Sequence, residues 1–427
     1  MLKLEELGVR LQETTLSNGC RLILYERPEM PLAINVVFLS GSRFDKNGKE
    51  GTAHFLEHMI TAGSSKFPSK DKLAAYIEQY GGIFGASTSD DTMNIRVSLG
   101  DPSDVSKAFD VLHEILLDPF FEEKILETER GSVLREIGET ISNPQRLIWE
   151  IYDKLFFQGT EIGRPTAGSE DSIPLISKED VSDFYKNNLV SGRMALVVSG
   201  GVKLDSLVKE AEGKILLPKS ERFILNKDLP VIRNNPVMIE YDKDADKVYL
   251  VFGFRAVGEN NVDIYPLRVI TNVLGGGRAS MLSKKLRYER GLVYTVSAGV
   301  HKLSDAGTVW ISTSILKEKL QETLDIITEE IRRVIQEGLT EEEVNFSKNK
   351  IIKSQRMAMQ TSELWAGFNS YAEVVGPKVI TLSDYTKGIE AVTPEDTKKV
   401  AQKYFTPNNW YLAMHGNVKE NGVKINL

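Results

Sequence analysis

Three residues that could do metal and acid–base chemistry stand close together early in the chain. Residues 51–60 read GTAHFLEHMI, in which His54, Glu57 and His58 form the pattern HxxEH. On a helix, residues four apart lie one above the other, so both imidazoles can reach one ion and Glu57 lies on the same face. A reactive zinc site uses three protein ligands and keeps one position for water. The pattern therefore predicts a helical zinc site that lacks its third ligand. The alternative is a capped surface helix with two half-buried histidines.

The order of the motif carries a resemblance to a known family. HxxEH is the reverse of HExxH and is the inverzincin signature. With it, the chain resembles the pitrilysin-like family of zinc metallopeptidases, which includes insulin-degrading enzymes and mitochondrial processing peptidases. The resemblance implies that His54, His58 and a distant glutamate hold one Zn²⁺ per chain, with Glu57 as the general base. Glu136, which follows His58 after 77 intervening residues, has the family's spacing.

A second glutamate accompanies the third ligand in that family, seven residues before it. The segment ETERGSVLREIGE supplies Glu129 and Glu136, which are seven apart and hence nearly on one helix face. By resemblance, Glu129 steadies a ligating histidine. The alternative for Glu129 is a charge on a solvated helix face. Glu127 and Glu139 lie nearby, but neither has the spacing.

The second half of the sequence repeats the first. SKEDVSDFYKN, which begins at Ser177, matches TPEDTKKVAQKYF at Thr393, and MALVVSGGV at Met194 matches WYLAMHGNV at Trp410, both with an offset of 216. A third pair of segments matches with an offset of 219. Three matches in one order indicate two copies of one fold. We expect an α+β protein with two homologous domains, each a mostly antiparallel sheet packed with helices.

The expected domains are residues 1–217, which hold the zinc site, and residues 237–427, joined by a proline-containing linker at 218–236. Under the offset of 219, Glu136 falls opposite Gln355 and Glu129 opposite Lys348. No histidine pair occurs at 264–274, where the second copy of the motif helix should lie. The second domain is therefore expected to bind no metal.

The spacing of apolar residues in the first half of the sequence predicts where its helices and strands lie. Asn18-Gly19 between two strand-like runs predicts a hairpin. Helix caps and apolar spacing predict the helices, and β-rich runs predict the strands. The expected helices are 51–62, 69–80, 103–117, 122–141, 144–156 and 178–187, and the expected strands include 33–39, 92–99 and 194–199.

Two further motifs resemble functional parts of the family. The segment RYERGLVYTVSAG places Arg287 and Tyr294 seven residues apart, like the arginine and tyrosine of the family's metal-free half. Both are suitable donors to an oxyanion. Ordinary surface roles for both residues are the alternative, and Arg290 is the alternative arginine.

The segment GGIFGASTSDDT, which begins at Gly81, resembles the family's edge strand, on which peptides add as an extra strand. The resemblance places Gly85, Ala86 and Ser87 against the substrate. The family usually has asparagine where this chain has Gly85, so backbone pairing would survive but one side-chain contact would be lost.

The composition of the chain excludes several classes of binding partner and of metal site. The formal net charge is -7 and basic residues do not cluster, which argues against nucleic acid and acidic lipid. No apolar run is long enough to cross a bilayer, and the first residues resemble neither a secretory signal nor a presequence, so we expect a cytoplasmic protein. A single cysteine, Cys20, excludes a multi-cysteine metal site.

The resemblance implies a zinc metalloendopeptidase that hydrolyses peptides or unfolded segments. Larger members join four such domains in one chain, so we expect a homodimer in which the zinc domain meets a partner subunit's second domain; a heterodimer with a related chain is also compatible. One alternative is a non-catalytic structural or peptide-binding subunit. Another is a hydrolase of a different bond.

Overall fold

The computed structural model describes residues 7–225, 229, 231, 234–368, 370–376, 381–419 and 423–427. Packing divides the chain into two compact units. Unit 1 comprises Met1–Gly138, Arg164–Leu225 and Gln355–Asp384, and unit 2 comprises Glu139–Gly163, Asn226–Ser354 and Tyr385–Leu427. Each unit therefore takes one segment from the opposite half of the sequence. The division at 217 and 237, which rests on the internal repeat, stays a prediction. Residues 226–228, 230, 232 and 233 of the expected linker lie outside the described residues.

Unit 1 is built on a mixed sheet. Within the described residues it has six strands in the order β1-β2-β6-β3-β5-β4. Only β2 and β6 pair in parallel, and the other neighbours are antiparallel. The expected hairpin at Asn18-Gly19 joins the first two strands, with Gly19 at a φ of 91°. The strands are β1 (Arg10–Thr15), β2 (Arg21–Glu26), β3 (Leu32–Phe38), β4 (Ile83–Thr88), β5 (Met93–Leu99) and β6 (Met194–Gly200).

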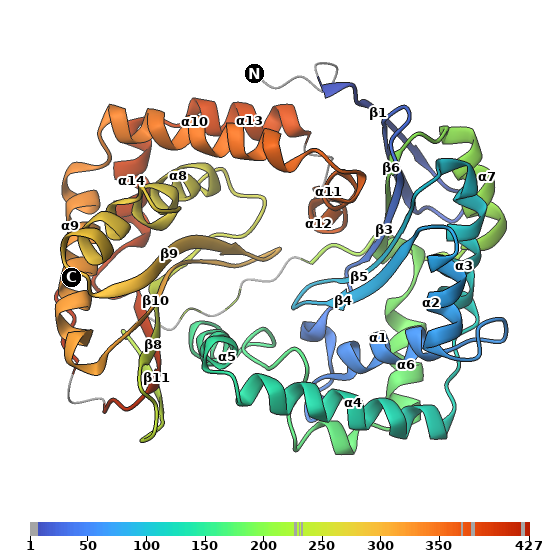
Figure 1. Cartoon of the computed structure of the whole chain (residues 1–427), viewed down its shortest axis with the longest axis horizontal. Helices are drawn as coiled ribbons and strands as arrows, with labels where there is room; N and C mark the ends of the chain where they lie inside the picture. The colour runs from blue at the N-terminus through green and yellow to red at the C-terminus, as the bar shows by residue number, and fades with distance from the viewer. Residues whose placement is uncertain are drawn as a thin grey trace. The chain divides into compact units, whose positions relative to one another are not determined.

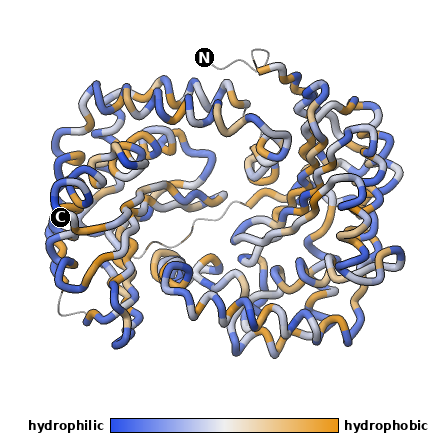
Figure 2. The backbone as a smooth tube through the Cα atoms, in the orientation of Figure 1, coloured by the Kyte–Doolittle hydropathy of each residue, from blue (hydrophilic) through white to orange (hydrophobic). Residues whose placement is uncertain are grey.

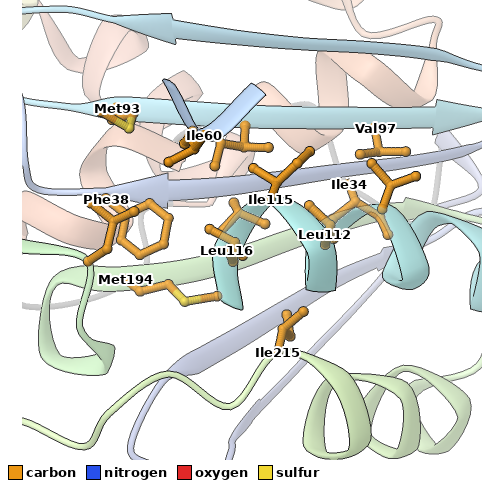
Figure 3. Close-up of a cluster of buried hydrophobic side chains, with 14 of the residues drawn as sticks. Ile34, Phe38, Ile60, Met93, Val97, Leu112, Ile115, Leu116, Met194 and Ile215 are labelled. Atoms are coloured by element: carbon orange, nitrogen blue, oxygen red, sulfur yellow. The ribbon is translucent and has the colours of Figure 1, made fainter. Parts of the chain in front are cut away.

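Helices cover both faces of this sheet, which explains why β3 is buried along its whole length. Ile34 and Phe38 on one face pack with Leu112 and Leu116 of α3, as Figure 3 shows. Val37 points to the other face and packs with residues of α12. Figure 1 shows α3 and α7 on one side of the sheet and α11 and α12 on the other. The helices of unit 1 are α1 (Thr52–Ala62), α2 (Lys70–Glu78), α3 (Val105–Leu117), α4 (Glu123–Ile141), α6 (Lys178–Asn188), α7 (Leu204–Lys214), α11 (Ser362–Gly367) and α12 (Ser370–Val375).

Unit 2 repeats this plan with a five-stranded sheet in its described part, ordered β7-β11-β8-β10-β9. Its one parallel pair, β7 with β11, occupies the place of β2 with β6, and the antiparallel pairs follow in the same order. Helix α5 covers one face, where it packs on β11 and β8, and α8, α9 and α14 share the core of the other. The strands are β7 (Val237–Tyr241), β8 (Val248–Ala256), β9 (Val293–Lys302), β10 (Gly307–Ile315) and β11 (Trp410–Gly416).

The remaining helices are α5 (Pro144–Phe156), α8 (Ile264–Gly275), α9 (Leu320–Glu337), α10 (Glu341–Ala358), α13 (Leu382–Ala391) and α14 (Pro394–Tyr404), with a π-helical turn, η6 (Ser283–Glu289). Shorter 3-10 turns are η2 (Ser42–Phe44), η3 (Pro102–Asp104), η4 (Ile173–Leu175), η5 (Ser191–Arg193) and η7 (Lys317–Lys319). Many helices alternate between hydrophobic and hydrophilic colour in Figure 2, as one-sided burial requires. Among the described helices, none is both long enough and apolar enough to span a bilayer.

The fold class is confirmed: two homologous α+β units, each with a mostly antiparallel sheet and packed helices. The repeat extends to helix caps. Ser177 and Asp180 form a capping box at α6, and Thr393 and Asp396 form the same box at α14. All six expected first-half helices are present, and their ends are shifted by at most one residue, except that the start of α3 and the end of α2 are each shifted by two.

Candidate metal centre

The N-terminus of α1 is fixed by residues before the histidine motif. Asp45 accepts hydrogen bonds from the backbone N–H of Gly51 at 2.7 Å and of Ala53 at 2.8 Å, which satisfies two free donors of the first turn. Gly51 has a φ of 94°, and an added Cβ would lie 2.7 Å from the carbonyl oxygen of Ala167. Only glycine fits the turn that precedes α1. The residues before the helix therefore fix the position of its first turn, and with it the position of the histidines.

His54, His58 and Glu136 converge at one point. Oε2 of Glu136 on α4 lies 3.6 Å from Nε2 of His54 and 3.6 Å from Nε2 of His58, both on α1. The three donor atoms lie within 4.8 Å of one another. Ligands of a tetrahedral zinc ion with bonds near 2.0–2.1 Å are about 3.3 Å apart. This set of two imidazoles and one carboxylate therefore fits zinc in both chemistry and spacing.

A buried carboxylate holds one of the two imidazoles. Nδ1 of His58 lies 3.0 Å from Oε2 of Glu129, and Nζ of Lys70 lies 2.7 Å from the same oxygen. The bond at Nδ1 leaves Nε2 of His58 for a metal. Nδ1 of His54, by contrast, is buried without a hydrogen-bond partner among the described residues. The protein thus fixes the orientation of one imidazole more firmly than that of the other.

The two histidines have opposite pKa shifts. Burial, together with the neighbouring His58, lowers the pKa of His54 to about 4. Burial also acts against the charged form of His58, but hydrogen bonds to Glu129 and Glu136 outweigh it and raise the pKa of His58 to about 9. Burial would raise the pKa of Glu129, yet the bonds from His58 and Lys70 hold it below its usual value. Without metal, one imidazole is therefore neutral and the other charged at neutral pH.

Glu57 lies beside this cluster and is bound by a strand residue. The hydroxyl of Thr88, the last residue of β4, donates to Oε2 of Glu57 at 2.6 Å. Burial raises the pKa of Glu57, and the bond from Thr88 opposes the shift. A carboxylate with a raised pKa is suited to accept and return protons near neutral pH.

The residues Gly85, Ala86 and Ser87 lie on β4, the terminal strand of the sheet within the described residues. They pair with Arg96, Ile95 and Asn94 of β5. Space is open at Gly85, because an added Cβ would meet no atom within 4 Å. Strand β4 also packs against α1, the helix that carries the histidines.

The arginine and tyrosine of the second motif lie together in unit 2. Arg287 is in η6 and Tyr294 is in β9, the terminal strand of the second sheet in the described part. The guanidinium of Arg287 lies over the ring of Tyr294, 5.0 Å from its centroid. Tyr294 is 78% exposed. Arg290, the alternative arginine, pairs with Glu322 at 3.1 Å instead.

Two family models match the chain in succession. The model described as Insulinase (Peptidase family M16) matches residues 22–170, and the model described as Peptidase M16 inactive domain matches residues 175–351. The chain belongs to the pitrilysin-like M16 peptidase family. It is of the short type with two domains, and the group of His54, His58 and Glu136 lies in the part that matches the first model.

Curated M16 relatives match nearly the whole chain. An uncharacterized zinc protease of Rickettsia felis is 26% identical over 92% of this chain and 94% of its own length. The mitochondrial-processing peptidase subunit beta of Lentinula edodes is 27% identical over 96% and 91%. The uncharacterized zinc protease YmxG of Bacillus subtilis is 24% identical over 93% and 96%. The names of all three relatives indicate a peptidase family, and two of the names include zinc.

Two solved structures share the fold of this chain. An M16 inactive domain from Pseudomonas fluorescens has a TM-score of 0.88 at 18% identity, covering 96% of this chain and 98% of its own. A protease from Helicobacter pylori has a TM-score of 0.88 at 18% identity, covering 95% and 99%. At these identities the likeness concerns the fold.

The sequence analysis did not name two residues that contact this cluster, Lys70 and Thr88. Lys70 is the first residue of α2 and contacts Glu129, which is 59 residues away; Thr88 contacts Glu57 across 31 residues. Thr88 stands one residue after the segment assigned to substrate. Lys70 follows Ser69, a recognisable helix cap, but the cap gives no hint of what the lysine contacts. No local signal could have found this pair.

Proposed function

We propose that the chain is a zinc-dependent endopeptidase that hydrolyses peptides or unfolded segments. The observation that carries the proposal is the convergence of His54, His58 and Glu136 at distances suited to one ion, with Glu57 on the same helix. The zinc protease names of the relatives support the same conclusion. One zinc per chain is expected, because the described residues contain one such group.

The roles of the side chains follow from their chemistry. A zinc ion bound here would acidify a water molecule and polarise the scissile carbonyl. Glu57 takes a proton from the attacking water and returns it to the leaving amine, a function suited to its raised pKa. Glu129 orients His58 through Nδ1 and keeps Nε2 directed at Glu136.

The substrate is proposed to bind as an extended strand along β4. The free edge of a terminal strand offers backbone N–H and C=O groups that an extended peptide can pair with. Gly85, Ala86 and Ser87 would form this contact through their backbones. Because pairing of this kind needs an exposed, extended chain, unfolded segments and peptides are the proposed substrates rather than folded domains.

The oxyanion formed during attack is proposed to be stabilised by Arg287 and Tyr294 of a partner subunit, so that a homodimer carries composite sites. The exposure of Tyr294 and the guanidinium held over its ring support this role. A heterodimer with a related chain is the alternative, since the name of one relative, a processing peptidase subunit, implies a partner.

The test compares the wild-type chain with Glu57→Gln on a library of internally quenched peptides. We expect zinc in both proteins and cleavage by the wild type alone, lost on chelation and restored by zinc. Zinc binding without any cleavage would reject the enzyme and favour a non-catalytic, peptide-binding subunit. Equal cleavage by both proteins would point to a contaminating protease and leave no support for Glu57 as the base.

A further inference from the structure

The hydrogen bond between Thr88 and Glu57 joins two parts of the site that the sequence treats separately. Glu57 belongs to α1 and to the metal motif, whereas Thr88 ends β4, the strand proposed to bind substrate. The donor hydroxyl and Oε2 of Glu57 are 2.6 Å apart, a short distance that suits a bond to an ionised carboxylate. The bond uses Oε2 of Glu57. The other carboxylate oxygen, Oε1, can then accept the proton of the attacking water and return it to the leaving amine.

Thr88 is itself held rigidly. It pairs with Met93 in the β4–β5 ladder, and the turn that follows is closed by a bond from the N–H of Ser89 to the carbonyl of Thr92 at 2.8 Å. As a β-branched residue, threonine has few side-chain rotamers in a strand. The hydroxyl therefore has a fixed position on a regular element, as a group that orients another residue requires.

The turn after Thr88 is fastened to a second segment. The N–H groups of Gly41, Ser42 and Arg43 donate to the carbonyls of Asp91, Ser89 and Asp90 at 2.9–3.0 Å. A Cβ at Gly41 would lie 2.2 Å from the carbonyl oxygen of Ser89, so the two backbones are in close contact there. This attachment fixes the end of β4 from the other side.

From these contacts we propose that Thr88 is a positioning residue, which holds the carboxylate of Glu57 in one rotamer and couples the substrate strand to the general base. The inference rests on the proposed peptidase function. It assigns Thr88 no contact with the metal and no proton transfer. Its effect should therefore fall on turnover, with little effect on zinc or peptide affinity, because small misplacement of a reacting group lowers rate far more than binding.

The kinetic test uses Thr88→Val, which keeps the shape and removes the hydroxyl, and Thr88→Ser, which keeps the hydroxyl. We expect kcat of Thr88→Val to fall about 10- to 100-fold, with KM and zinc content close to wild type, and Thr88→Ser to retain most of the activity. Thr328→Val is the matched control, since the hydroxyl of Thr328 bonds to backbone carbonyls within its own helix, α9 in unit 2. An unchanged kcat in Thr88→Val, or equal loss in Thr88→Ser, would overturn the inference.

A structural test separates this inference from the proposed function. Crystal structures of wild type and Thr88→Val should show one ordered rotamer of Glu57 in the wild type and several in the variant, whether or not the chain cleaves peptides. The same single rotamer in both proteins would reject the positioning role. A wild-type protein that binds zinc but cleaves nothing would reject the proposed function alone.

Discussion

Oε2 of Glu129 accepts from Nδ1 of His58 at 3.0 Å and from Nζ of Lys70 at 2.7 Å, so one buried oxygen serves both a proposed metal ligand and a lysine. The carboxylate thereby orients the imidazole, and the lysine helps to keep the carboxylate ionised. The sequence alone allowed two interpretations of Glu129, a residue that steadies a ligating histidine or a charge on a solvated helix face. The burial of Glu129 excludes the solvated helix face.

Replacing this carboxylate by an amide should weaken zinc binding. Glu129→Gln keeps the volume and can still accept from Nδ1, but it removes the negative charge, so we expect zinc affinity to fall about 10- to 100-fold. Competition with a chromogenic chelator measures it. The control is Glu127→Gln on the same helix, whose exposed carboxylate pairs with Arg130. An equal loss in both variants would mean that general helix charge, rather than the bond to His58, is responsible.

Zinc binding should release a proton. In the metal-free protein the pKa of His58 is about 9, so its imidazole is charged at pH 7 and must lose a proton to ligate. His54, with a pKa of about 4, is already neutral and contributes none. Zinc affinity should therefore rise about tenfold per pH unit between about pH 6 and 8 and level off above the pKa of His58. Calorimetry at pH 7 in buffers of different ionisation enthalpy should give about one proton released per zinc. A value near zero would contradict the shift at His58.

Two inactive variants should restore activity when mixed. Glu57→Gln disables the base and Tyr294→Phe removes the proposed oxyanion donor. In a composite homodimer, subunit exchange creates one site with both residues intact, so we expect about a quarter of wild-type activity from a statistical mixture of subunits. Each variant alone, incubated in the same way, is the control. No recovery after demonstrated exchange would place both residues of a working site in one chain.

Loss of the Arg43 guanidinium should destabilise unit 1. Nη1 of Arg43 lies 2.6 Å from Oδ1 of Asp91, and both side chains are almost completely buried. Arg43→Met leaves the charge of Asp91 without this partner, which typically costs about 3–5 kcal/mol in the free energy of unfolding. Urea denaturation measures the change. Lys46→Met, which removes an exposed pair with Asp183, should leave the urea midpoint unchanged.

Sequence analysis predicted most of the local structure, and it named the three side chains that the structure brings together, His54, His58 and Glu136. The helix with His54 and His58 is set by short-range spacing, and Asn18-Gly19 specifies its hairpin without help from the rest of the chain. Glu136 was found through resemblance, since no local rule chooses it over Glu139. The hydrogen bond from Thr88 to Glu57 could not be predicted from the sequence, because it depends on how β4 packs against α1. The periodicity of a sequence does not indicate which separate segments pack together.

The exchange of helices between units was likewise hidden from sequence. The apolar face of α5, with Ile151 and Tyr152, packs in the core of unit 2, although the helix follows directly on α4, which carries Glu136 in unit 1. Trp365 of α11 packs with Tyr25 in unit 1, although it lies far along the second half. Amphipathic spacing shows that such helices bury a face, but not which sheet receives it.

This exchange determines what a single cut in the chain would do. A protease that nicked the backbone between 218 and 236 would yield two fragments, and each would still hold a helix that completes the other's core. We expect the two fragments to remain associated and to co-purify after cleavage. Either half expressed alone would expose an apolar surface and aggregate. Duplication has therefore left two units, each of which needs a segment from the other half of the sequence to complete its core.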